Sequence, residues 1–327
     1  MSLLTRTVII LFIQNTMLVF SILVILLYDA RVSKIGKDEN TKSFYQRLIE
    51  QRKSMISRSN DETDRRIKRY LKKICKLDKL RFEKFMQIDF KNESPTELLE
   101  KFHEVMMDPY NMACAHGQRF GGKYHPSCKY RVGATFVCVD DLLNEVIDGT
   151  CLIYSVGIKQ DWAFEDFMDD IGCKVFALDS TVSHPPMRGN NITFSRLGVS
   201  IKPNKLDTLR SILQTNGHTM TKIFYLKLDI EGVELLGLSK WLNSGALDYV
   251  QQIAIKFHLH KIGSTLIFFE IIKRLYVDGK YRLISYDMNE CYDDKSKSKN
   301  RTYFGLANIV LQKITTDYRL IEKDCLI

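Results

Sequence analysis

Two acidic residues that end apolar runs constrain the fold of this chain more than any other feature. Asp179 closes the run Lys174–Asp179, and Asp229 closes the run Phe224–Asp229 fifty residues later. A third apolar run, Cys151–Gly157, precedes both. Short apolar runs are typical of buried parallel strands, and acids at their carboxyl ends lie where open α/β sheets bind ligands. The pattern therefore predicts a cofactor pocket at one edge of a parallel sheet.

The segment Cys151–Asp179 has the length of one strand–helix–strand unit, with Asp161 as the expected N-cap and Gly172 just after the helix end. Asp179 follows Gly157 by 22 residues, near the spacing at which a carboxylate meets ribose hydroxyls. A dinucleotide fold needs a G-x-G-x-x-G turn, but here Gly157 stands alone. The turn therefore favours S-adenosylmethionine, which has no phosphate, over a dinucleotide. The alternative is an ordinary turn glycine followed by a surface aspartate.

Further apolar runs predict the rest of the sheet. Strands that alternate with helices indicate the α/β class, with a doubly wound and mostly parallel sheet. The expected strands are residues 192–199, 249–257, 281–286 and 303–312, and the expected helices are 206–213, 234–242 and 263–277.

The N-terminal region predicts a membrane anchor. Val8–Leu27 matches the roughly 20 apolar residues that cross a bilayer. No small-x-small cleavage site follows at Tyr28–Ala30, which favours an uncleaved anchor over a signal peptide or a buried core helix. The expected organisation is a tail (1–7), an anchor (8–28), a helical stalk (29–93) and a main domain (94–327). The main domain begins at Ser94–Glu97, where Ser, Pro and Glu form a capping box.

Charge is concentrated in the stalk. Residues 31–91 carry 19 Lys and Arg against 9 Asp and Glu, whereas residues 92–327 carry 28 against 29. The near-neutral main domain gives no support to a nucleic-acid partner. The stalk is expected to be a solvated helix, or alternatively a surface for anionic lipid or an acidic partner.

Two signals for the compartment disagree. Arg31, Lys34 and Lys37 follow the anchor and Arg6 precedes it, which by the positive-inside rule favours a cytosolic domain. The chain has eight cysteines, five of them within residues 114–173, which suits an oxidising compartment. We expect a glycoprotein whose domain is lumenal, in the endoplasmic reticulum or Golgi, or extracellular. The candidate N-glycosylation sequences begin at Asn92, Asn191 and Asn300.

The string Lys227–Glu234 is the most specific in the chain, because acids at a strand end need solvent, a hydrogen-bond partner or a ligand. It resembles the hallmark of FkbM-type methyltransferases. Residues 110–312 are more closely similar to the methyltransferase-like protein 24 family, through the strings 151–158, 175–179, 255–260 and 303–308.

This resemblance implies a seven-strand class I methyltransferase domain that uses S-adenosylmethionine. By position, Ser155 and Gly157 would line the methionine end of the cofactor, and Asp179 its ribose. The implied catalytic residues, as candidate bases for an oxygen nucleophile, are Asp229, Glu231 and His258.

Alternatives remain at the histidines. His258 and His260 could be structural, or could hold a metal with Asp229, although no metal is expected.

The chain departs from the family patterns at two positions. Ser155 stands where most class I methyltransferases keep an acid, and Lys256 stands where FkbM-type proteins often carry glutamate.

The function expected from the sequence is a membrane-anchored S-adenosylmethionine-dependent methyltransferase, acting on oxygen in an unknown small-molecule, glycan or protein acceptor. An inactive scaffold with the same fold is one alternative. A secretory-pathway glycosyltransferase is another, because Asp229-Ile230-Glu231 resembles a metal-binding Asp-x-Asp sequence.

Overall fold

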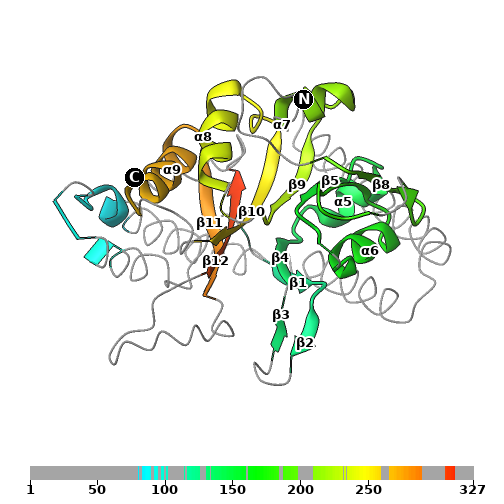
Figure 1. Cartoon of the computed structure of the whole chain (residues 1–327), viewed down its shortest axis with the longest axis horizontal. Helices are drawn as coiled ribbons and strands as arrows, with labels where there is room; N and C mark the ends of the chain where they lie inside the picture. Colours follow the sequence, from blue (N-terminus) through cyan, green and yellow to red (C-terminus); the bar gives the residue numbers. More distant parts are fainter. Residues whose placement is uncertain are drawn as a thin grey trace, which may run out of the picture. The chain divides into compact units, whose positions relative to one another are not determined.

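The structure is a computed structural model, and it describes residues 80, 83–89, 92–94, 97–98, 101, 114, 116–125, 130–132, 134–159, 161–183, 187–197, 209–230, 232, 234–258, 265–288 and 306–313. All of them belong to one compact unit, Ser59–Ile327 (Figure 1). The expected tail, the anchor and most of the stalk lie outside the described residues. Within the described ranges, no helix has the length and hydrophobicity to span a bilayer.

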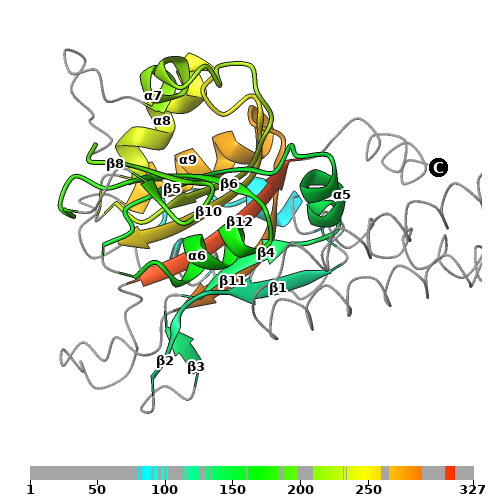
Figure 2. The ribbon, with the colours of Figure 1, turned by 90° about the vertical axis from the view of Figure 1, so that its right-hand side faces the viewer.

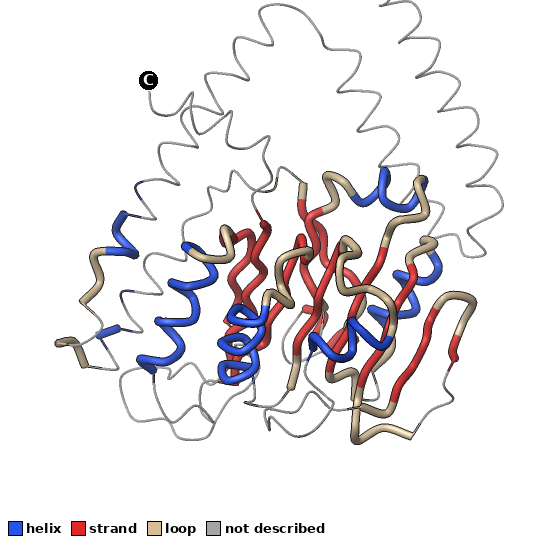
Figure 3. The backbone as a smooth tube through the Cα atoms, turned by 90° about the horizontal axis from the view of Figure 1, so that it is seen from above, coloured by secondary structure: helices blue, strands red, loops and turns tan. Residues whose placement is uncertain are grey.

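An eight-stranded sheet forms the centre of this unit, in the order β11-β12-β10-β9-β5-β6-β8-β7. Figure 3 shows strands of the domain lying side by side. β12 and β7 run antiparallel to their neighbours, and the remaining pairs are parallel. The sheet confirms the expected α/β class and all seven expected strands, and it adds the two-residue strand β7. The strands are β5 (Leu152–Val156), β6 (Lys174–Leu178), β7 (Met187–Arg188), β8 (Ile192–Ser195), β9 (Ile223–Leu228), β10 (Val250–His258), β11 (Tyr281–Met288) and β12 (Leu306–Lys313).

Helices cover both faces of the sheet. α7 (Leu209–Thr215), α8 (Glu234–Ser244) and α9 (Thr265–Val277) lie on one face, whereas α6 (Ala163–Asp170) lies on the other (Figure 2). A short helix, α5 (Leu142–Ile147), precedes β5. Because side chains alternate along a strand, Tyr154 and Leu226 point into the large core under α7–α9, while their neighbours Ser155 and Lys227 point toward α6.

The helix starts predicted from the sequence are mostly correct. Ser94 and Glu97 form the expected capping box, in which the Ser94 N–H donates to Glu97 Oε2 at 2.9 Å and the Glu97 N–H donates to Ser94 Oγ at 3.3 Å. The N-cap of α6 is Trp162, so the assignment to Asp161 was wrong by one residue. The Asp161 carboxylate still accepts the Ala163 N–H at 3.3 Å.

Four short strands that the sequence did not predict precede β5. They are β1 (Gly117–Phe120), β2 (Lys123–His125), β3 (Tyr130–Val132) and β4 (Thr135–Cys138), paired as β1–β4 and β2–β3. β4 is held to the main sheet by Gln252 of β10, whose amide accepts the Cys138 N–H and donates to the Cys138 carbonyl, each at 2.9 Å. The Tyr225 hydroxyl of β9 also donates to the Phe136 carbonyl. These partners lie about a hundred residues away, which is why local sequence did not reveal the strands.

Two disulfides occur among the described residues, one at the end of β4 and one between the residues that precede β5 and β6. Cys114 pairs with Cys138, and Cys151 pairs with Cys173. No cysteine in the described part of the chain is free.

Candidate active site

The carboxyl ends of β5, β6 and β9 lie side by side because the three strands are parallel neighbours. Backbone hydrogen bonds continue past the strand ends: the Gly157 N–H donates to the Leu178 carbonyl at 2.8 Å, and the Asp229 N–H donates to the Val156 carbonyl at 3.0 Å. His258 ends β10, the other neighbour of β9. The structure thus brings to one edge the predicted residues Ser155, Gly157, Asp179, Asp229 and His258, whereas Glu231 and His260 lie outside the described residues.

Gly157 is required by the close approach of two strand ends. Its φ is +83°, and a Cβ atom there would lie 1.9 Å from the Asp229 carbonyl oxygen. Any side chain would therefore push the β5 turn away from the Asp229 backbone. This glycine therefore lets the turn and the Asp229 backbone lie next to each other.

Asp179 fastens the same turn to the end of β6. Its Oδ2 accepts the Lys159 N–H at 2.8 Å, and its Oδ1 accepts both the N–H and the hydroxyl of Thr181 at 2.7 Å. Burial alone would raise the pKa of Asp179, but the hydrogen bonds from Thr181, Lys159 and Val182 outweigh it and hold the pKa below its ordinary value. Asp179 is therefore an ionised acceptor at this edge.

Ser155 points into a buried ionic cluster. The Ser155 hydroxyl donates to Glu165 Oε1 at 2.5 Å, and Lys227 Nζ donates to the same oxygen at 2.8 Å. Glu165 is completely buried in the first turn of α6, and Lys227 Nζ also lies 5.1 Å from the centre of the Phe164 ring. Ser155 is thus the hydroxyl that orients a carboxylate supplied by the neighbouring helix.

Asp229 lies between a lysine and a histidine. Its Oδ2 accepts from Lys256 Nζ at 3.0 Å, so Lys256 forms an ion pair with this acid. Its Oδ1 lies 3.5 Å from His258 Nε2, too far for an ordinary hydrogen bond. Asp229 Oδ1 is therefore a buried carboxylate oxygen that has no hydrogen-bond partner in the described part of the chain.

Glu234 fixes the orientation of His258. Its carboxylate accepts the backbone N–H groups of Ile230 at 3.1 Å and Gly232 at 2.9 Å, and its Oε1 lies 2.8 Å from His258 Nδ1. Because Glu234 is the acceptor in all three bonds, the imidazole proton is assigned to Nδ1. In the neutral ring, Nε2 then carries a lone pair and faces Asp229. Both Glu234 and His258 are buried.

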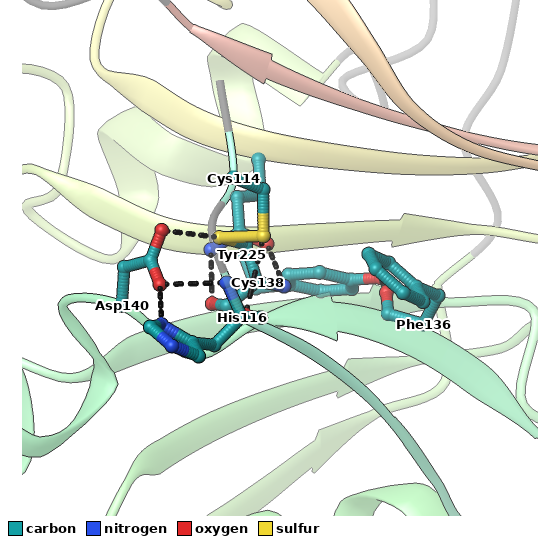
Figure 4. Close-up of a disulfide and its surroundings, with 7 residues drawn as sticks. Cys114, His116, Phe136, Cys138, Asp140 and Tyr225 are labelled. Atoms are coloured by element: carbon teal, nitrogen blue, oxygen red, sulfur yellow. Dashed lines mark hydrogen bonds and ion pairs between the residues drawn. A yellow bond between two sulfur atoms is a disulfide. The ribbon is translucent and has the colours of Figure 1, made fainter. Parts of the chain in front are cut away.

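One cluster of potential metal ligands occurs in the described ranges, and it lies away from this edge. Cys114, Cys138 and Asp140 place their ligand atoms within 4.8 Å of one another. The two sulfurs are bonded to each other, and Asp140 is engaged by the N–H and Nδ1 of His116, each at 2.9 Å (Figure 4). A disulfide has no thiolate to offer a metal, so the cluster is a structural cross-link.

Comparison with known proteins identifies the class of this fold. The sequence profile of a family described as a methyltransferase domain matches residues 71–277, more than half of the chain. The chain belongs to this methyltransferase-domain family. Membership confirms the expected methyltransferase and implies S-adenosylmethionine as its methyl donor.

The other comparisons are more distant. The Streptococcus pneumoniae protein Sp1610, provisionally assigned as a tRNA (m1A22) methyltransferase and crystallised with S-adenosyl-L-methionine, is 9% identical, with a TM-score of 0.29. The likeness covers 56% of this methyltransferase and 78% of that chain. No curated protein shows significant sequence similarity.

The residues at the sheet edge fit the methyl donor. S-adenosylmethionine carries a positive sulfonium, a positive ammonium and two ribose hydroxyls, all of which suit carboxylate oxygens. This methyltransferase offers the Asp179 carboxylate and the buried Glu165 Oε2, which has no partner among the described residues.

Sequence reasoning missed Glu165, Lys227 and Glu234 as site residues. Lys227 and Glu234 belong to the recognised string 227–234, and the helix spacing places Glu234 at the start of α8 beside the strand end. A signal for both was therefore present. Glu165 gave no such signal, because its partners Ser155 and Lys227 come from two different strands.

Proposed function

We propose that this methyltransferase is anchored in a membrane by residues 8–28 and transfers the methyl group of S-adenosylmethionine to an oxygen of its acceptor. The acceptor is a small molecule, a glycan or a protein, and nucleic acid is not a partner. The observation that carries the proposal is the array of Asp229 with the buried His258 and Glu234 at the carboxyl edge of the sheet.

His258 is the proposed general base. With the proton on Nδ1 held by Glu234, Nε2 is able to accept the proton of an acceptor hydroxyl. The imidazolium formed would then have carboxylates on both sides, since Asp229 Oδ1 lies 3.5 Å from Nε2. Asp229 is assigned the stabilisation of this charge, because its other oxygen is occupied by Lys256.

Methyl transfer is an in-line displacement, and positioning of the reacting groups contributes much of its rate. The turn after β5 supplies this positioning. Bound S-adenosylmethionine supplies an electrophilic methyl group. In this proposal Ser155 and Gly157 would lie at its methionine end, and Asp179 at its ribose. The backbone bonds between Gly157, Leu178, Asp229 and Val156 fix these residues relative to one another.

A binding experiment separates this proposal from its alternatives. The full-length protein, purified in detergent micelles, is titrated with S-adenosylmethionine and separately with a nucleotide sugar plus Mn²⁺. Binding of the first alone supports methyl transfer, binding of the second alone supports a glycosyltransferase, and binding of neither supports a scaffold.

Two variants test the residue roles. Asp179→Ala is expected to abolish S-adenosylmethionine binding, whereas Asp229→Asn is expected to bind normally and to lose turnover. Normal binding by Asp179→Ala would remove the ribose assignment.

The proposed compartment is lumenal or extracellular. The Cys114–Cys138 and Cys151–Cys173 disulfides support an oxidising environment, and Asn191 is exposed at the start of an Asn-Ile-Thr sequence. The Asn191 amide donates to Asp169 Oδ1 at 3.0 Å, and a glycosylated amide keeps one N–H for this bond. Protein from animal cells should lose mass on glycosidase treatment, and Asn191→Gln should lose one glycan. A chain without glycosidase-sensitive mass would contradict this compartment.

A further inference from the structure

Glu165 is a fully buried carboxylate that the proposed mechanism does not use. Its Oε1 receives two hydrogen bonds, from Ser155 Oγ at 2.5 Å and from Lys227 Nζ at 2.8 Å. Its Oε2 is buried and has no hydrogen-bond partner among the residues that the structure describes. Leaving a buried acceptor unsatisfied costs about 1–3 kcal/mol, and more for a charged group, so such an oxygen in a packed domain points to a missing partner.

The position of Glu165 limits what this partner is. Ser155 pairs in register with Lys227 across β5 and β9, and Ser155 is two residues before Gly157, while Lys227 is two residues before Asp229. Glu165 stands in the first turn of α6, the helix that follows the Gly157 turn. Glu165 Oε2 therefore lies near the sheet edge at which the proposed function puts the methionine end of the cofactor.

The charges of Glu165 and Lys227 further limit the chemical class of the missing partner. Glu165 and Lys227 form a neutral pair, and Lys227 is itself only 15% exposed. Adding a lone cation to this pair would create an uncompensated buried charge, which is costly. An α-amino acid end carries an ammonium and a carboxylate together, so it satisfies Oε2 while leaving the cluster neutral.

We propose that Glu165 Oε2 accepts a hydrogen bond from the α-ammonium group of the bound methyl donor. In this chain the acid for that group comes from α6 and is oriented by the Ser155 hydroxyl and Lys227, in place of an acid on the strand itself. This inference rests on the proposed function, since it concerns the same cofactor pocket.

The test compares two ligands that differ only in this group. Full-length protein in micelles is titrated calorimetrically with S-adenosylhomocysteine and with its analogue in which hydrogen replaces the α-ammonium. A charge-assisted hydrogen bond predicts that the wild type prefers S-adenosylhomocysteine by about 10- to 100-fold. Glu165→Gln should remove this preference, because the glutamine presents an N–H donor where Oε2 accepted. Asp170→Asn, which removes an exposed acid on the same helix, should keep it.

A double variant guards against misfolding. If Glu165→Gln alone leaves Lys227 unpaired and does not fold, Glu165→Gln/Lys227→Gln removes both charges together and should show the same loss of preference. A preference that persists in either variant overturns the inference and leaves the proposed function intact, and would mean that Oε2 holds only a buried water. Failure of the wild type to bind S-adenosylhomocysteine overturns both.

Discussion

Glu234 Oε1 lies 2.8 Å from His258 Nδ1, and both side chains are buried. The two residues come from different elements, the first turn of α8 and the end of β10. The same carboxylate accepts the N–H groups of Ile230 and Gly232. One buried acid thus fixes both the loop after Asp229 and the tautomer of the histidine.

Replacing this acid should reduce turnover without weakening cofactor binding. Glu234→Gln presents an N–H donor to His258 or to the loop, which disfavours the tautomer in which Nδ1 carries the proton and Nε2 can accept one. Since a positioned base contributes about 100-fold or more, single-turnover methyl transfer should slow by that order. The affinity for S-adenosylhomocysteine should stay within about twofold. The matched control is Glu145→Gln, another buried glutamate, bonded to Thr150 and Lys222 and remote from this edge. Equal slowing in both variants would refute the assignment.

Much of this arrangement follows from the sequence, and the reasons are local. Apolar runs that end in Asp179 and Asp229 gave the parallel strands and the edge at which they meet, because strand burial and chain direction are encoded within a few residues. The capping box at Ser94 and Glu97 is equally local and was also predicted correctly.

What sequence did not reveal depends on residues far apart in the chain. Gln252 holds β4 through a side chain that mimics a strand partner across 114 positions. Glu165 became meaningful only when Ser155 and Lys227 were seen to converge on it from two strands. Such contacts require the register between strands, which periodicity alone does not give.

Gly157→Ala should destabilise the domain severely. At φ +83° a side chain costs about 1–2 kcal/mol, and its Cβ would lie 1.9 Å from the Asp229 carbonyl oxygen. Overpacking against backbone adds about 1–3 kcal/mol to the loss in free energy of unfolding, measured by urea denaturation. Gly149→Ala is the matched control, because Gly149 has φ +69° with no atom within 4 Å of the added Cβ. The control should show the conformational cost alone. Similar losses in the two variants would mean that the contact with Asp229 is unimportant.

His218 should make stability fall on the acid side of neutrality. Burial, and then the nearby positive Lys174, hold the pKa of His218 below its ordinary value, so the folded state favours the neutral ring. Burial raises the pKa of Tyr154 to about 12, so its hydroxyl stays protonated and donates to His218 Nδ1 at 2.7 Å. The unfolded chain therefore binds a proton near pH 6.5 that the folded chain binds only at lower pH.

The free energy of unfolding should accordingly decrease as the pH falls below about 6.5, until the folded-state pKa is passed. His218→Gln should remove this part of the pH dependence, whereas His116→Gln, at a partly exposed histidine, should retain it. Denaturation curves between pH 8 and pH 5 measure the difference, and the NMR titration of His218 gives its pKa directly. A His218 pKa above 6.5 would contradict the argument.

The two described disulfides should differ in their resistance to reduction. Cys151 and Cys173 are 2% and 0% exposed, whereas Cys114 is only partly buried. Thiol exchange requires access of the attacking thiolate to a sulfur, so mild reductant under native conditions should open Cys114–Cys138 first. Alkylation followed by mass spectrometry identifies the opened pair.

Loss of the Cys114–Cys138 disulfide, which spans 24 residues, should lower the free energy of unfolding by about 3 kcal/mol, since the unfolded chain regains the freedom of the loop. The double variant Cys114→Ser/Cys138→Ser should match the reduced protein, and the Gln252 bonds should keep β4 on the sheet in both. Simultaneous opening of Cys151–Cys173 would show that local burial does not protect it.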